Sequence, residues 1–146
     1  MLQVKAITKN LAQTMFAGEE QYRSMFADDK LSLRTMKLRE AIYYGGYVGR
    51  KLVLLIMLLP YKDGHKVHAH INPKYRFSAR AFAKLVLTNW HSPMYTRIPE
   101  CYRGYIRFCK RIGFTVESKH SGEYLKNGVS YGSLNMMWSK GNARYH

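Results

Sequence analysis

The sequence predicts a single α/β domain over residues 1–146. Three observations support this class. Strand-like and helix-like apolar spacings alternate from one end of the chain to the other. Apolar residues make up 47% of the chain, which favours a packed core and excludes a disordered protein. We find no repeat, linker or low-complexity segment that would divide the chain.

The expected elements follow from these spacings. Strands are expected at residues 2–8, 41–48, 51–59, 66–72, 94–98, 114–119 and 129–139. Helical spacing occurs at residues 11–17, 19–25, 31–40, 77–89 and 101–112. Asp63-Gly64 and Asn127-Gly128 are signals for turns between neighbouring strands. The most apolar run, Leu52 to Leu59, is far short of the ~20 residues that cross a bilayer, so we interpret it as a buried strand.

The segment from Val67 to Leu87 combines a strand, a basic turn and a helix. Along the strand, His68 and His70 alternate with the apolar Val67, Ala69 and Ile71. Pro73 ends the strand. The helix is expected to begin near Phe77, with an apolar stripe of Phe82, Leu85 and Val86.

The start of this helix is predicted to bind an anion. Lys74, Arg76 and Arg80 surround it. A helix start also offers unpaired N–H groups and the positive end of the helix dipole. Together these features indicate a site for a phosphate or pyrophosphate.

A second helix is expected within CYRGYIRFCKRIGF, residues 101–114. Its apolar stripe is Tyr102, Tyr105, Ile106, Phe108, Cys109 and Ile112. Its basic residues, Arg103, Arg107, Lys110 and Arg111, lie on the other faces. Gly113 is a typical helix end, and Phe114 begins a strand.

These two segments resemble the GNAT family of acyl-CoA N-acyltransferases. That family carries a pattern near V-x-P-x-x-R-G-x-G-x-G, whose backbone N–H groups hold the pyrophosphate of coenzyme A. The matching residues here are Ile71, Pro73, Arg76, Phe77, Ala79 and Ala81. The run Phe108 to Phe114 is similar to the family's L-Y-E-K-L-G-F. The resemblance covers roughly residues 44–138 and implies a mixed, mostly antiparallel sheet of six to seven strands, flanked by helices, with splayed central parallel strands.

The resemblance also implies a cofactor, acetyl-CoA or another acyl-CoA, and a set of site residues. Its binding residues would be Ile71, Asn72, Arg76, Phe77, Ser78, Ala79, Arg80, Ala81 and Tyr105. Cys109 stands where the family has a tyrosine that donates a proton, and a thiol can also donate one. The family's carboxylate base is absent from the strand, which leaves His68 or His70 as the proton acceptor. Phe77, which replaces a glycine, could narrow the cofactor site.

Two other functions are compatible with the sequence. Glycine-poor chains of this kind are similar to divergent bacteriophage-encoded GNAT-like proteins, some packaged in virions, so a catalytically degenerate virion or assembly protein is one alternative. The other is a nucleic-acid-binding protein, because the chain carries a net charge of +15. That charge is uneven, since residues 41–146 hold 17 basic and 4 acidic residues, a net of +13. An acidic protein partner would fit the same surface.

Other features indicate the cellular compartment and argue against a metal site. No secretory signal is recognised at the start of the chain. Cys101 and Cys109 would lie about 12 Å apart on one helix, too far for a disulfide, and lone thiols fit the cytoplasm of a cell or of a phage host. His65, His68 and His70 offer no evident third metal ligand, so we interpret them as structural histidines or a base and expect no metal.

Overall fold

The computed structural model of the protein describes residues 1–18 and 41–142. Its elements, in chain order, are β1 (Leu2–Ala6), α1 (Lys9–Gly18), β2 (Ile42–Val48), β3 (Lys51–Tyr61), β4 (Gly64–Ile71), η2 (Pro73–Ser78), α2 (Ala79–Thr88), β5 (Met94–Pro99), α3 (Arg103–Arg111), β6 (Thr115–Lys126), β7 (Val129–Trp138) and η3 (Lys140–Asn142). The helices expected at residues 19–25 and 31–40 lie outside the described residues.

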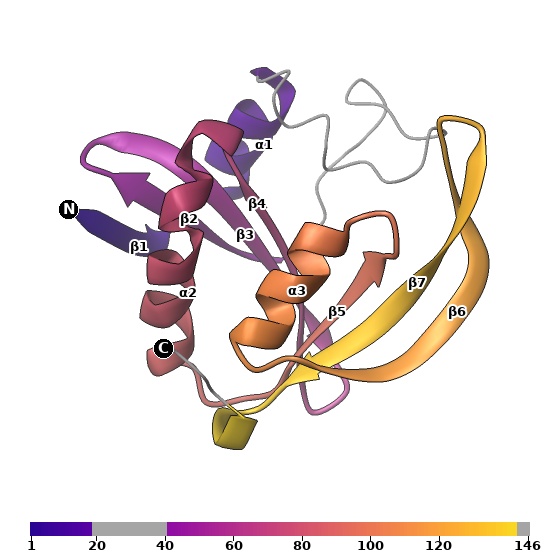
Figure 1. The fold of residues 1–146 in the computed structure, drawn as a ribbon. Coiled ribbons are helices and arrows are strands. Elements are labelled where there is room, and N and C mark those ends of the chain that lie inside the picture. The colour runs from indigo at the N-terminus through magenta and orange to yellow at the C-terminus, as the bar shows by residue number, and fades with distance from the viewer. Residues whose placement is uncertain (19–40, 143–146) are drawn as a thin grey trace.

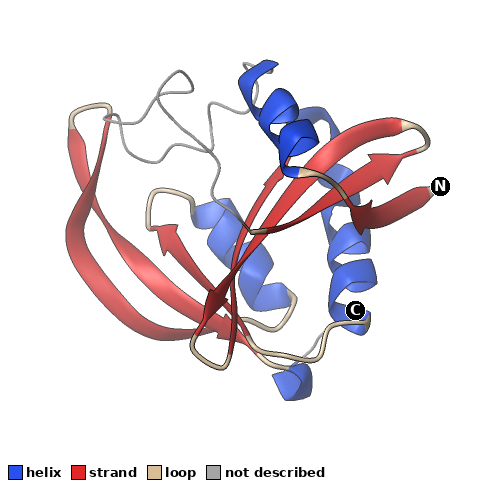
Figure 2. Ribbon diagram, turned by 180° about the vertical axis from the view of Figure 1, so that it is seen from behind, coloured by secondary structure: helices blue, strands red, loops and turns tan. Residues whose placement is uncertain are grey.

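The strands form one seven-stranded sheet in the order β1-β2-β3-β4-β5-β7-β6. Every neighbouring pair is antiparallel except β4 and β5, which are parallel. Helices α2 and α3 cover one face of the sheet and α1 lies on the other (Figures 1 and 2). The predicted mixed sheet with a central parallel pair is therefore confirmed.

The main core lies between the sheet and the two helices α2 and α3. Phe82 and Leu87 of α2 and Ile106 of α3 are buried there against Leu58 of β3 and Trp138 of β7. Burying these large apolar side chains removes them from water, which is the main force that holds helices and sheet together. The core also fixes which face of β4 is turned inward.

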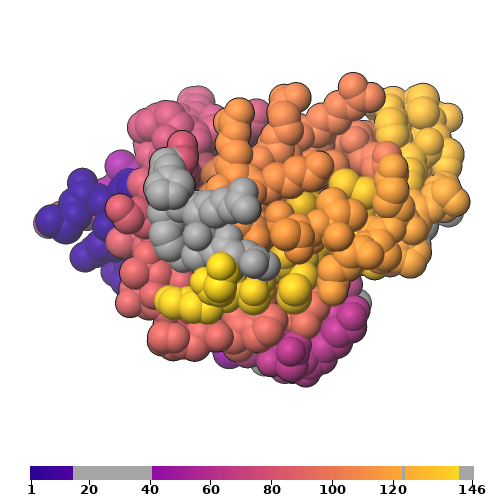
Figure 3. All heavy atoms as spheres, turned by 60° about the horizontal axis from the view of Figure 1, so that its bottom comes forward, coloured from indigo at the N-terminus to yellow at the C-terminus, as the bar shows by residue number. Residues whose placement is uncertain are grey.

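The expected helices differ from the observed ones at their starts. Residues 73–78 form the 3₁₀ helix η2, so α2 begins at Ala79 and not near Phe77. The buried stripe also differs from the predicted one, because Leu87 is buried while Leu85 is 41% exposed. Helix α3 begins at Arg103, which leaves Cys101 and Tyr102 ahead of it. The basic residues predicted on its outer faces are all exposed, and Figure 3 shows orange side chains from this part of the chain projecting from the surface.

Both predicted turns are present. The loop between β3 and β4 is formed by Lys62 and Asp63, because Tyr61 already pairs with Gly64. A side chain at Gly64 would collide with the carbonyl oxygen of Pro93, so only glycine fits where the β3–β4 hairpin passes the chain entering β5. Asn127 and Gly128, both with positive φ, connect β6 to β7.

Candidate active site

The parallel strands β4 and β5 separate soon after they meet. Their ladder consists of two residue pairs, His65 with Met94 and Lys66 with Tyr95. Beyond these pairs β4 continues along β3 and β5 continues along β7, so their facing edges diverge (Figure 1). Residues 67–71 of β4 and 96–99 of β5 thus have no ladder partner across the opening. The predicted splay is confirmed, and its edges can hydrogen-bond an extended ligand.

Asn72 holds the turn that follows β4. Its side chain is 2% exposed, and its Oδ1 accepts a hydrogen bond of 3.0 Å from the N–H of Lys74. Its carbonyl accepts one of 2.8 Å from Tyr75, and its own N–H donates one of 2.7 Å to Val53. Because these groups are engaged inside the protein, a direct contact of Asn72 with acyl-CoA is disfavoured. The backbone N–H of Asn72 is thus not available to an anion at this turn.

The start of α2 is a strongly basic surface. Lys74, Arg76 and Arg80 are exposed there, and the Lys51 ammonium lies 5.5 Å from the ring centroid of Tyr75. Three other predicted binding residues occupy the same region, with Ser78 buried, Ala79 half-buried and Ala81 exposed. The region contains no acidic residue, so its charge and the helix dipole both favour an anion.

The Phe77 side chain lies at the surface of the turn. Its side chain is 82% exposed and stacks on Tyr75, with 6.2 Å between ring centroids. The phenyl ring, which stands where the family has a glycine, points to solvent beside the turn. The gap between β4 and β5 is therefore not filled by this ring.

His68 and His70 lie on the face of β4 opposite to Val67, which packs in the core. Burial, together with the charge of the neighbouring His68, lowers the pKa of His70 from 6.5 to about 3. His70 is therefore neutral at physiological pH and is a weak base. Between the two histidines, this environment disfavours His70 as the proton acceptor.

Cys109 is paired with a tyrosine. Its side chain is 3% exposed among the core residues, and burial raises the pKa of its thiol to about 12 although the hydrogen bond from Tyr105 opposes this rise. The Tyr105 hydroxyl makes that hydrogen bond, while its side chain as a whole is 37% exposed. Burial of the hydroxyl, followed by the Cys109 charge, raises the pKa of Tyr105. Burial thus keeps both groups protonated, and they differ in that the Tyr105 side chain is partly exposed whereas the predicted Cys109 is not.

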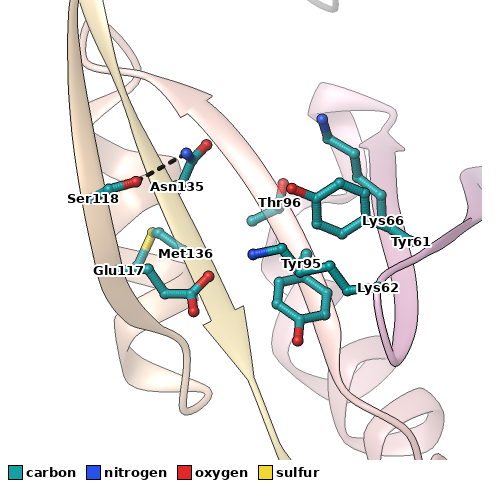
Figure 4. Close-up of a pocket in the computed structure, with 9 residues that line it drawn as sticks. All are labelled: Tyr61, Lys62, Lys66, Tyr95, Thr96, Glu117, Ser118, Asn135 and Met136. Carbon is teal, nitrogen blue, oxygen red and sulfur yellow. Dashed lines mark hydrogen bonds between the residues drawn. The ribbon is translucent and has the colours of Figure 1, made fainter.

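A pocket of about 130 Å³ opens where β4 and β5 begin to separate. It lies on the sheet face that carries Lys66, on the same side of β4 as the two histidines. Figure 4 shows its two walls, one from the β3–β4 hairpin and one from β6 and β7, with β5 between them. The lining residues are Tyr61, Lys62, Lys66, Tyr95, Thr96, Glu117, Ser118, Asn135 and Met136.

The hairpin wall is a cluster of lysines on tyrosine rings. The Lys62 ammonium lies 5.4 Å from the ring centroid of Tyr61 and 5.3 Å from that of Tyr95, and the Lys66 ammonium lies 5.4 Å from Tyr61. The Tyr95 hydroxyl donates a 2.5 Å hydrogen bond to Asp63. That bond to a carboxylate, with burial, raises the pKa of Tyr95 to about 12. The tyrosines thus fix two cations at one side of the pocket.

The opposite wall carries a carboxylate and an amide. Asn135 donates a hydrogen bond of 2.9 Å to Ser118. Glu117 lies between Val116 and Ser118, where the pairing of β6 with β7 shifts register. Such a bulge re-aims a side chain, and the Glu117 carboxylate is drawn facing the lysine wall (Figure 4).

None of the pocket residues was among the predicted site residues. Glu117 looks like an ordinary exposed strand residue in the sequence, and the register shift that turns it has no local signature. The one available signal was Lys62-Asp63-Gly64, which predicts a turn but not what the turn faces. Within residues 1–18 and 41–142, no group of three or more potential metal-ligating side chains occurs. Over the same residues, no helix is both long and apolar enough to span a membrane.

Solved structures resemble the whole described architecture. Spermidine N-acetyltransferase from Vibrio cholerae, in complex with CoA and spermine, matches with a TM-score of 0.75 and 12% identity over 97% of this chain and 96% of that one. The ribosomal-protein-S18-alanine N-acetyltransferase from Escherichia coli matches with a TM-score of 0.73 and 9% identity over 94% and 93%. An N-acetyltransferase from Staphylococcus aureus Mu50 matches with a TM-score of 0.67 and 14% identity over 97% and 99%. No protein-family model matches the sequence, and the search of curated proteins gave no match.

Proposed function

We propose that this chain, which has the GNAT fold, is an acyl-CoA-dependent N-acyltransferase that uses acetyl-CoA. The observation that carries the proposal is the parallel ladder of β4 and β5, which ends after two residue pairs. A sheet gains stability from continued pairing, so an opening in its middle favours a ligand that pairs with the free strand edges. One of the similar solved structures contains CoA.

The residues around the opening fit acyl-CoA, which would supply the acyl group as a thioester. Arg76 and Arg80 would meet its phosphates beside the start of α2, where the helix dipole is favourable. The open edge of β4, up to Ile71, would hydrogen-bond the extended pantetheine arm. Tyr105 would lie beside the thioester end.

The chemistry requires one proton acceptor and one proton donor. An amine nitrogen forms a bond to the acyl carbon, the carbon–sulfur bond breaks, and the proton lost by the amine is balanced by one gained at the sulfur. His68 faces the side of the sheet where the pocket opens and would accept the amine proton. The Tyr105 hydroxyl, which is neutral over the working pH range, would donate to the sulfur.

Calorimetric titration with acetyl-CoA tests the binding half of this proposal. Arg76→Ala should weaken binding about tenfold or more, since a charge-assisted contact to phosphate is lost. Lys119→Ala, which removes an exposed cation from the distant strand β6, is the matched control and should leave binding unchanged. Absence of binding at millimolar acetyl-CoA would overturn the proposal, and equal small losses in both variants would show diffuse attraction only.

A second candidate function is binding of nucleic acid, which the charge on the outer surfaces of α2 and α3 favours. Exposed cations recur at helical spacing at Arg76, Arg80 and Lys84, and again at Arg103, Arg107, Lys110 and Arg111. Neither helix contains an acidic residue. This function predicts binding of DNA or RNA that weakens steeply with salt and is insensitive to acetyl-CoA. Filter binding at several salt concentrations distinguishes it from the enzyme.

The remaining predictions from the sequence are not tested by the fold. They are a bacteriophage origin, a role in a virion or its assembly, an acidic protein partner and a cytoplasmic location. Each stays a prediction.

A further inference from the structure

The pocket at the point where β4 and β5 separate has one wall of each charge. Lys62 and Lys66 stand on the hairpin side, and Glu117 stands on the β6 side (Figure 4). Neutral hydrogen-bonding groups from Ser118, Asn135 and Thr96 lie between or beside them. A small ligand that carries both a positive and a negative group would match the two walls at once.

The lysine wall is held in place before any ligand arrives. Lys62 occupies a two-residue turn with a φ of 48°, and its ammonium lies over two tyrosine rings. Tyr95 is itself fixed by its hydrogen bond to Asp63. A cation held in this way loses little side-chain freedom on binding, which favours affinity for an anion.

The pocket adjoins the opening where the proposed acyl donor would lie. Lys66 and Tyr95 form the last pair of the parallel ladder, and both line the pocket. Thr96, the next residue of β5, also lines it. A ligand in a space of about 130 Å³ therefore sits directly beside the gap between the strands.

We infer that this pocket binds the acyl acceptor, and that the acceptor is a small amine that also carries a carboxylate. Its carboxylate pairs with Lys62 and Lys66, and its ammonium faces Glu117. The identity of this ligand as an acceptor rests on the proposed N-acyltransferase function, whereas its binding does not.

This substrate class differs from that of a structural neighbour. The Vibrio cholerae enzyme is a spermidine N-acetyltransferase and its solved structure contains spermine, a polycation. Here the chain carries a net charge of +15, and two of the three charged residues at the pocket are lysines. A polyamine would be repelled by this surface, while an amino carboxylate would be attracted.

Three ligands with the same four-carbon chain test the contributions of the carboxylate and of the ammonium separately. 4-Aminobutyrate carries both groups, butyrate carries only the carboxylate, and 1,4-diaminobutane carries only amines. NMR titration of the wild-type protein should show the tightest binding for 4-aminobutyrate and the weakest for the diamine. Tighter binding of the diamine than of 4-aminobutyrate would overturn the inference.

Variants of the protein test which group of the ligand each wall binds. Lys62→Gln should weaken both 4-aminobutyrate and butyrate about tenfold, because one charge-assisted contact is lost. Glu117→Gln should weaken 4-aminobutyrate and leave butyrate unchanged or tighter. The control is Lys5→Gln on β1, because Lys5 also stacks on a tyrosine, with its ammonium 4.5 Å from the ring of Tyr47. Equal effects of Lys62→Gln and Lys5→Gln would overturn the pocket assignment.

Acetyl-CoA titration of the same samples separates this inference from the proposed function. Lys62→Gln should bind acetyl-CoA as the wild type does. If acetyl-CoA binds and 4-aminobutyrate has no preference over the diamine, the inference fails and the proposed function stands. If 4-aminobutyrate binds through Lys62 and acetyl-CoA does not bind, the pocket stands as an amino-carboxylate site and the acyltransferase function fails.

Discussion

The hydroxyl of Tyr95 on β5 donates a 2.5 Å hydrogen bond to the carboxylate of Asp63, which lies in the turn between β3 and β4. The bond joins the β3–β4 turn to β5, close to the point where β4 and β5 separate. Because the acceptor is a carboxylate, it raises the pKa of Tyr95 to about 12.

Asp63→Asn should therefore lower the pKa of Tyr95 toward the ordinary value of 10.0. The amide still accepts a hydrogen bond but no longer opposes a phenolate with a negative charge. NMR titration of tyrosines labelled at Cζ measures the change. An unchanged Tyr95 titration in Asp63→Asn would show that burial, and not the carboxylate, sets this pKa.

His70 should make stability depend on pH. The folded state holds this side chain neutral down to a pH of about 3, whereas the unfolded chain takes up a proton near 6.5. Because the unfolded state binds more protons in this window, the free energy of unfolding is fully retained above pH 6.5 and falls as pH is lowered toward 3, by up to about 1.4 kcal/mol per pH unit.

Urea denaturation at several pH values checks this expectation. His70→Asn should flatten the dependence, and His91→Asn, at an exposed histidine, should not. An identical slope for the wild type and His70→Asn would contradict the assignment.

The two cysteines should differ in reactivity. Cys109 is buried with its thiol pKa raised to about 12, while Cys101 is partly exposed and both are free. Since the thiolate is the reactive form, iodoacetamide at pH 8 should label Cys101 first and Cys109 only on unfolding. Mass spectrometry of timed samples measures both rates. Comparable labelling of Cys109 in the folded protein would mean that its thiol is accessible after all.

Substitutions at Cys109 and Tyr105 distinguish a core residue from a proton donor. Cys109→Ser should cost up to about 1–3 kcal/mol of stability, because a more polar hydroxyl enters the core and the Tyr105 hydrogen bond offsets only part of that cost. Cys109→Ala should keep acyl transfer, because the thiol is not proposed as the donor. Tyr105→Phe should reduce kcat by about 10²-fold or more and have little effect on acetyl-CoA binding. Loss of transfer in Cys109→Ala with a stable fold would restore the thiol as donor.

The sequence predicted the strands better than the starts of the helices. Apolar patterns located all seven strands: a continuous run for β3, and alternation in strands with one face toward a core. The start of α2 was placed wrongly because Asn72-Pro73 was treated only as the end of a strand. An asparagine followed by proline is also a helix-start signal, and here Asn72 caps the 3₁₀ helix η2.

The candidate site was predictable only where its residues are close in the sequence. The basic turn with Arg76 and Arg80 could be recognised because one short segment contains it. The pocket could not, because it joins Lys62, Tyr95 and Glu117, three distant parts of the chain. The burial of Cys109 agrees with its place on the predicted apolar stripe, but its hydrogen bond with Tyr105 was not predicted.

The register shifts in β6 have a consequence for how copies of the protein meet. Strand β6 forms one edge of the sheet, and its pairing with β7 is interrupted between Val116 and Ser118 and again between His120 and Tyr124. An edge bent in this way, with Lys119 exposed on it, is a poor template for a strand from another molecule. The register shift that turns Glu117 toward the pocket therefore also disfavours edge-to-edge pairing of two copies, and with it aggregation at high protein concentration.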